Sequence, residues 1–114
     1  MQDCFSDYAD NYIEYRDFIY SYFADRPITD GYDAQREGLE FLDESKLTER
    51  ERFIMVMSVI KWEIEHDMLT PELEGELDYY YDEFVTGRLA EHISSEDVEP
   101  ITTDLIECYK KIFE

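Results

Sequence analysis

One short motif in the chain has the spacing of a metal site, Glu63-x-x-His66. Di-iron helical bundles use this spacing, but they need two such motifs and two further carboxylates on facing helices. The second histidine, His92, has Leu89 three positions before it, so the second motif is missing. The ligand count therefore excludes a di-iron centre, and we expect neither a metal nor another cofactor. His66 is instead expected at a helix end, where the helix dipole favours a cation.

No residue set in the sequence has the spacing of a catalytic site. Nucleophile motifs, glycine-rich phosphate loops and Cys-x-x-Cys pairs are all absent from the sequence. Pairs of acidic residues are plentiful, but a chain with 30 Asp and Glu produces such pairs by chance. Since no acid, base and nucleophile are assembled, the sequence predicts a protein that is not an enzyme.

The net charge of −20 over 114 residues is the strongest compositional signal. A chain this acidic is repelled by nucleic acids and by anionic membranes, and it is attracted to basic protein surfaces. The charge is unevenly distributed, because residues 62–109 contain fifteen acids and a single base, Arg88. The sequence therefore predicts a basic protein as the partner, and neither nucleic acid nor a membrane surface.

Length, aromatic content and cysteine usage favour a cytoplasmic domain. A chain of 114 residues fits one folded domain, and 16% aromatic residues argue against disorder. The first ten residues lack the basic and apolar regions of a signal peptide. Cys4 and Cys108 lie far apart and in no metal spacing, so both thiols are expected to be free in a reducing compartment.

Residues 48–67 are predicted to form a buried central helix. Two apolar stripes run along opposite sides of it, which indicates neighbours on both sides. The stripes are Phe53, Met57, Ile60 and Ile64 on one side, and Met55, Val59 and Trp62 on the other. Thr48 and Glu51 form a capping box at its start.

Four further segments are predicted to surround the central helix. The first, about 3–23, has an aromatic stripe, and the second, about 31–44, is weakened by an internal glycine. The stripe of the first segment consists of Phe5, Tyr8, Tyr12, Tyr15, Ile19 and Tyr22. Thr70-Pro71 begins the fourth helix and Gly87 closes it.

The last helix has two interpretations, because a proline deep inside a helix costs about 3 kcal/mol. Either a short turn precedes a helix that starts at Pro100, or the helix passes through Pro100 with a kink. Residues 88–93 are interpreted as a connector, and no segment alternates as a strand does. We predict an all-α fold, one domain over residues 1–114, with about five helices.

The outer face of the fourth helix is the predicted binding surface. Tyr79 points away from the apolar stripe of that helix, and acids surround it. An exposed aromatic ring among carboxylates suits the binding of a basic surface. The candidate residues are Glu72, Glu76, Tyr79, Asp82 and Glu83, followed by a second acidic cluster of Glu96, Asp97 and Glu99. Under the alternative, Tyr79 packs beneath a loop and the acids form only a solvated face.

Four segments support a resemblance to a known class of protein. They are Leu69-Thr-Pro-Glu-Leu, Tyr79-Tyr-Tyr-Asp-Glu-Phe, Gly87-Arg-Leu and Ile93-Ser-Ser-Glu-Asp. The layout of residues 48–114 resembles small acidic helical immunity proteins of bacterial toxin systems. This resemblance implies a cytoplasmic inhibitor that binds and blocks a cognate toxin domain, often a nuclease.

The expected function is therefore inhibition by occlusion, with carboxylates in place of phosphates on a basic face of the partner. One alternative is a DNA-mimic inhibitor of another nuclease. The other is a structural or adaptor module whose charge serves only solubility. Salt separates electrostatic inhibition from the adaptor, because electrostatic binding weakens as ionic strength rises.

Overall fold

The computed structural model describes residues 11–25, 28–38, 49–93 and 95–113. These residues form six helices and contain no strand, so the predicted all-α fold is confirmed for the described chain. The helix that the sequence analysis did not predict is α5 (Leu89–His92), a single turn within the segment that it interpreted as a connector. None of the helices in these ranges is both long enough and apolar enough to cross a membrane.

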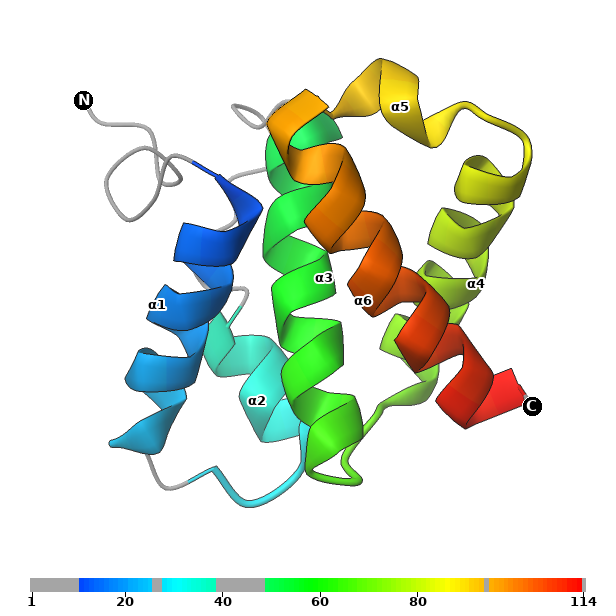
Figure 1. Cartoon of the computed structure of the whole chain (residues 1–114). Coiled ribbons are helices and arrows are strands. Elements are labelled where there is room, and N and C mark those ends of the chain that lie inside the picture. Colours follow the sequence, from blue (N-terminus) through cyan, green and yellow to red (C-terminus); the bar gives the residue numbers. More distant parts are fainter. Residues whose placement is uncertain (1–10, 26–27, 39–48, 94, 114) are drawn as a thin grey trace.

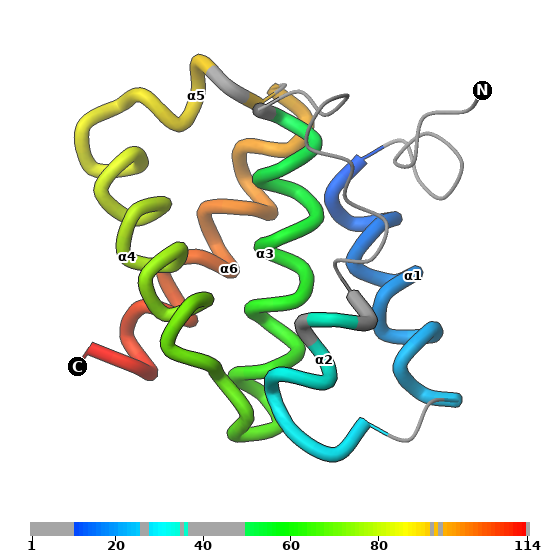
Figure 2. Tube along the Cα trace, turned by 180° about the vertical axis from the view of Figure 1, so that it is seen from behind, coloured from blue at the N-terminus to red at the C-terminus, as the bar shows by residue number. Residues whose placement is uncertain are grey.

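Helix α3 (Glu49–Glu65) lies at the centre of the fold. Figure 1 shows α1 on one side of it, α4 on the other, and α6 crossing its front face. Seen from behind in Figure 2, α2 lies beside its C-terminal half. Every residue from Phe53 to Ile60 is buried, as are Trp62 and Ile64, so both predicted stripes are confirmed. Thr48 of the predicted capping box lies outside the described residues.

Helix α1 (Tyr12–Ala24) starts later than predicted. Asn11 is in an extended conformation, and its side chain accepts a hydrogen bond from the backbone N–H of Glu14. Asn11 is therefore the N-cap at which α1 begins. The prediction of one continuous helix from about Asp3 is wrong. Phe5 and Tyr8 of the predicted stripe lie outside the described residues, whereas Tyr12 and Tyr15 are fully buried.

Helix α2 (Gly31–Gly38) approaches the loop between α3 and α4 closely. A Cβ atom on Gly31 would lie 1.7 Å from the backbone oxygen of Met68, so only glycine fits there. The predicted continuation of this helix to Glu44 falls outside the described residues. Ala34, which is fully buried, packs α2 into the core.

Helices α4 (Pro71–Val85), α5 (Leu89–His92) and α6 (Ser95–Phe113) complete the fold. The predicted connector contains α5, since Leu89 and Ile93 are both buried and hold this turn against the core. Helix α6 is continuous through Pro100, so the interpretation with a helix that starts at Pro100 is wrong. Pro100 is the sixth residue of α6, where its missing N–H removes one hydrogen bond from an early turn.

Candidate partner-binding face

The start of α4 fixes the orientation of the predicted binding face. The Thr70 side chain accepts a hydrogen bond from the Leu73 N–H at 3.3 Å, and Pro71 occupies the first turn. Leu73, Leu77 and Tyr80 are buried against the core. The Tyr80 ring lies 4.2 Å from the ring of Phe53 in α3, measured between centroids. This packing turns the opposite side of α4 towards solvent.

The outward face of α4 combines one aromatic ring with several acids. Tyr79 is 50% exposed, as predicted, and its ring lies against that of Tyr80 with centroids 5.7 Å apart. Glu72 and Asp82 are exposed on the same side of the helix. Asp78, which the sequence analysis did not select, is also exposed and directly precedes Tyr79. On the helix surface its neighbour is Asp82, four positions later, so the helical wheel places Asp78 at the edge of this face.

A groove of about 330 Å³ lies beside Tyr79. Arg52 of α3 and Glu76 of α4 line it, and they form an ion pair with an N–O distance of 3.3 Å. Glu76 is therefore partly neutralised by its own chain. Gly75 also lines the groove, and a Cβ atom there would meet no atom within 4 Å, so the groove is open to solvent at this position.

Glu83 is a correction to the predicted binding set. Its side chain is only 6% exposed, and one carboxylate oxygen lies 2.7 Å from Nε of Arg88. The prediction that Glu83 faces away from the core is wrong, because the turn after α4 folds Arg88 back over it. Glu83 therefore stabilises the junction of α4 and α5 and is not available to a partner.

Asp97 is a second correction. It is fully buried, and its carboxylate accepts hydrogen bonds from the Tyr12 N–H at 2.9 Å and from Arg50 at 3.2 Å. Its neighbours Glu96 and Glu99 are exposed at the start of α6. The predicted acidic cluster is thus divided between one structural acid and two surface acids, on a different helix from Tyr79.

Several acidic side chains are buried and are therefore not part of the protein surface. Asp104 is 5% exposed, and it accepts hydrogen bonds from the Tyr12 hydroxyl at 2.6 Å and from Arg16 at 2.7 Å. A polar network of this kind needs every member satisfied, since an unpaired buried charge is costly. The buried acids within the described ranges are Glu51, Glu63, Glu83, Asp97 and Asp104. Fewer acids are therefore available to a partner on the surface than the 30 in the sequence.

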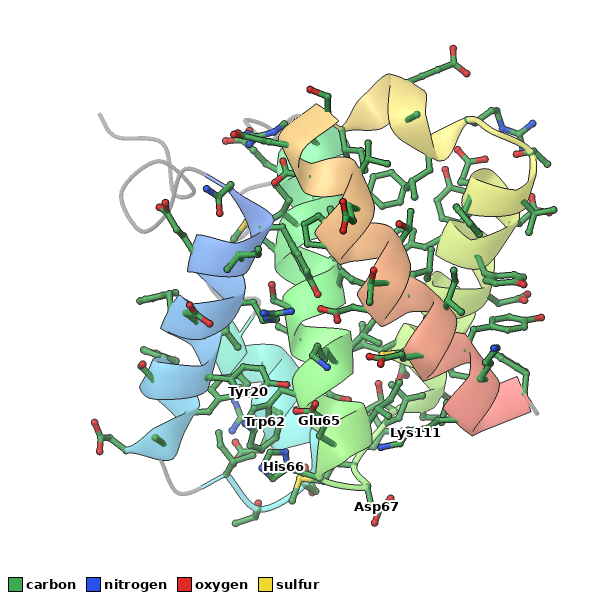
Figure 3. The ribbon with its side chains drawn as sticks, in the orientation of Figure 1. Tyr20, Trp62, Glu65, His66, Asp67 and Lys111 are labelled. Carbon is green, nitrogen blue, oxygen red and sulfur yellow. The ribbon has the colours of Figure 1, made fainter. Side chains whose placement is uncertain are left out.

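Glu63 and His66 of the E-x-x-H motif point to different partners. The Nδ1 atom of His66 lies 2.7 Å from the backbone oxygen of Trp62, and its ring stacks on the Trp62 ring at 4.0 Å (Figure 3). Glu63 instead accepts a hydrogen bond from the Thr70 N–H at 3.2 Å. In the described part of the chain, no three His, Cys, Asp or Glu side chains are grouped as metal ligands.

Glu63 is the most perturbed carboxyl group near α4. It is completely buried, and its Oε2 atom has no hydrogen-bond partner among the described residues. Burial raises the pKa of Glu63 to about 8, and the negative charges of Asp30 and Glu72 raise it further, against the lowering effect of the Thr70 N–H. The folded protein therefore holds a carboxyl group that is protonated at neutral pH, at the junction of α2, α3 and α4.

Comparisons with known proteins found no relative of this chain. No model of a protein family, no curated protein and no solved structure matches the chain.

Proposed function

We propose that this protein binds a basic surface of a partner protein through the outer face of α4 and thereby inhibits the partner. The supporting observation is Tyr79, an aromatic side chain that is 50% exposed among acids on a well-anchored helix. Tyrosine is enriched among the residues that dominate binding energy, because its ring provides a large contact area at a low entropic cost.

The carboxylates around Tyr79 supply the electrostatic part of the proposal. Within the described ranges, no cation lies within 4 Å of Glu72 or Asp78, so both carboxylates can accept lysine or arginine from a partner. Asp82 has only a weak exposed pair with Arg88, at 3.5 Å. Such charges accelerate association and select against partners of the wrong sign.

The proposed mechanism is occlusion, as in the immunity proteins that this chain resembles. The rigid acidic helix would cover the basic face that a toxin domain uses for its own substrate. For a toxin that cleaves nucleic acid, the carboxylates would occupy the positions of phosphates. The protein would have no catalytic step of its own, and it would act in the bacterial cytoplasm.

The first test is whether a reading frame next to the gene encodes a toxin-like domain, which then serves as the partner. Its affinity is measured by titration at about 50 mM and about 300 mM salt, and its activity is assayed at a one-to-one ratio. We expect inhibition at this ratio, with at least about tenfold weaker binding at the higher salt concentration. Binding without inhibition, or affinity that does not change with salt, would favour an adaptor whose acidity serves only solubility.

A further inference from the structure

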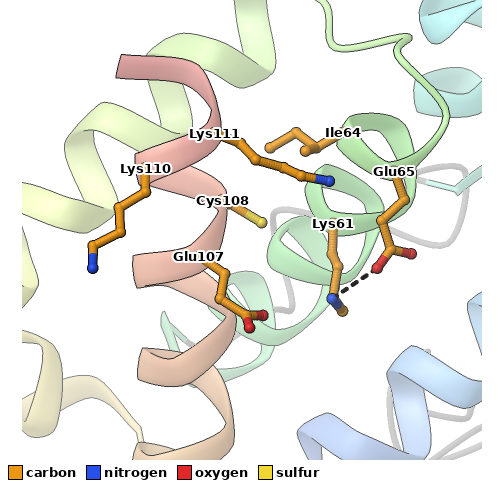
Figure 4. A pocket seen from close by; sticks show the side chains of 7 residues that line it. All are labelled: Lys61, Ile64, Glu65, Glu107, Cys108, Lys110 and Lys111. Atoms are coloured by element: carbon orange, nitrogen blue, oxygen red, sulfur yellow. Dashed lines mark hydrogen bonds and ion pairs between the residues drawn. The ribbon is translucent and has the colours of Figure 1, made fainter. Parts of the chain in front are cut away.

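A cavity of about 450 Å³ lies between the last turns of α3 and α6, away from Tyr79 (Figure 4). Its size falls within the range of small-molecule sites. Ile64 and Cys108 form its apolar part, and both side chains are more than 90% buried. Burial raises the pKa of the Cys108 thiol to about 12, so the thiol is uncharged at neutral pH and behaves as a small apolar group.

The cavity has a cationic rim in a strongly acidic protein. Three lysines line it together with two glutamates, although the whole chain has a net charge of −20. The residues of this rim are Lys61, Lys110, Lys111, Glu65 and Glu107. A concave surface with excess positive charge is therefore an exception to the overall composition of the molecule.

The two rim lysines nearest the apolar floor differ in their partners. Lys61 is held by Glu65 at 2.9 Å and faces Asp104 at 3.7 Å. Glu65 also accepts a hydrogen bond from the Tyr20 hydroxyl, so its carboxylate is already engaged at this end of the bundle (Figure 3). Lys111 forms no ion pair within 4 Å among the described residues, although its positive charge still acts on Glu65 over a longer distance. Its ammonium group reaches over the cavity towards Ile64.

We infer that this cavity binds a small organic carboxylate with a short aliphatic chain. The chain would displace water from Ile64 and Cys108, and the carboxylate would pair with the Lys111 ammonium group. Burying apolar area stabilises the bound chain by about 25 cal/mol per Å². Because the Lys111 ammonium group is positively charged, the cavity would select an anionic ligand over a cation of equal size. This inference does not depend on the proposed inhibition, which uses another face of the protein.

Helix electrostatics offers a simpler explanation for the lysines alone. Lys110 and Lys111 both lie in the last turn of α6, where the helix dipole favours cations. That explanation treats the two residues alike. In Figure 4 the Lys110 ammonium group points away from Cys108 and Lys61, whereas that of Lys111 points over the floor. The two residues therefore form a matched pair for a test.

The experiment is a titration of the ¹⁵N-labelled protein, followed by backbone amide shifts. The probes are hexanoate, hexylammonium with the opposite charge, and acetate without the chain. We expect saturable shifts around Ile64 and Cys108 with hexanoate, and at least about tenfold weaker binding of the other two probes. A difference of that size corresponds to about 1.4 kcal/mol.

Two exposed substitutions then separate the site from general charge. Lys111→Gln should weaken hexanoate binding about fivefold, the effect of losing one ion pair of about 1 kcal/mol, whereas Lys110→Gln should change it less than twofold. Equal weakening in both variants would assign the effect to general charge and overturn the site. Equal binding of hexanoate and hexylammonium, or hexanoate shifts away from this cavity, would also overturn it.

Discussion

The carboxylate of Asp97 accepts a hydrogen bond from the backbone N–H of Tyr12 at 2.9 Å, across 85 positions of sequence. Tyr12 is the first residue of α1, so this N–H has no partner inside its own helix. The second carboxylate oxygen lies 3.1 Å from Arg50 of α3. One buried acid in the first turn of α6 thus joins the starts of three helices.

Asp97→Ala should lower the free energy of unfolding by about 3–5 kcal/mol, because it leaves Arg50 and the Tyr12 N–H without their buried acceptor. The measurement is urea unfolding followed by circular dichroism. Glu99→Ala is the control, since this exposed acid of the same helix should change stability by less than about 0.5 kcal/mol. Similar small losses for both variants would show that Asp97 does not hold the helices together.

Glu63 should make stability depend on pH between about 4.5 and 8. Its folded pKa is raised to about 8, so protonation favours the folded state. Its contribution is fully present below the pKa of the unfolded chain and is lost as pH rises through the folded pKa. Because each pKa unit corresponds to about 1.4 kcal/mol, Glu63→Gln should stabilise the protein by up to about 5 kcal/mol at pH 9 relative to its effect at pH 4.

The check on Glu63 is a pair of unfolding curves at several pH values, for the parent and for Glu63→Gln. Glu74→Gln is a matched control, because Glu74 is an exposed glutamate near the start of α4. Parallel pH profiles for the parent and Glu63→Gln would mean that Glu63 does not titrate in this range.

The Cys108 thiol should be free but slow to react in the folded protein. Within the described residues it forms no disulfide, it is 3% exposed, and burial raises its pKa to about 12. The other cysteine, Cys4, lies outside the described residues. Since the thiolate is the reactive form, iodoacetamide at pH 8 should label Cys108 quickly only after unfolding in denaturant. Mass spectrometry of the alkylated, non-reduced protein measures this. Rapid labelling of Cys108 in the native protein would show that the packing of α6 is looser than described.

Charge reversal on the outer face of α4 should leave the protein folded but weaken its binding to the partner. Asp78→Lys combined with Asp82→Lys changes two exposed positions and avoids the buried Glu83. The like charges that it places against a basic partner cost several kcal/mol, so we expect affinity for the toxin domain to fall by at least about a hundredfold. Tyr79→Ala should weaken binding by about 2 kcal/mol if the ring is an anchor.

A matched control for the α4 face lies on the opposite side of the bundle. Asp17→Lys with Asp25→Lys makes the same change in net charge on two exposed positions, one in α1 and one directly after it. This variant should bind within about threefold of the parent at physiological salt, where remote charges are screened. If both double variants lose affinity equally, only net charge matters, and the contact surface is not α4.

Local sequence was sufficient to predict the central helix and its two buried sides. Periodicity alone placed Met57 and Val59 on opposite faces, because a helix repeats every 3.6 residues wherever it lies in the fold. The end signals of α4 are equally local: Thr70 caps its start, and Gly87 follows its end with a positive φ of 82°. The outward direction of Tyr79 follows from the same geometry.

Tertiary structure alone decided which acids are on the surface. A helical wheel shows Glu83 and Asp97 only as polar residues outside the apolar stripes of their own helices. It does not show that Arg88 and Arg50 lie next to them. The two acids are buried because those cations, and the Tyr12 N–H of a distant helix, lie close enough to replace water. The cavity between α3 and α6 likewise exists only because Ile64 and Lys111, 47 positions apart in the sequence, are placed together by the packing of two helices.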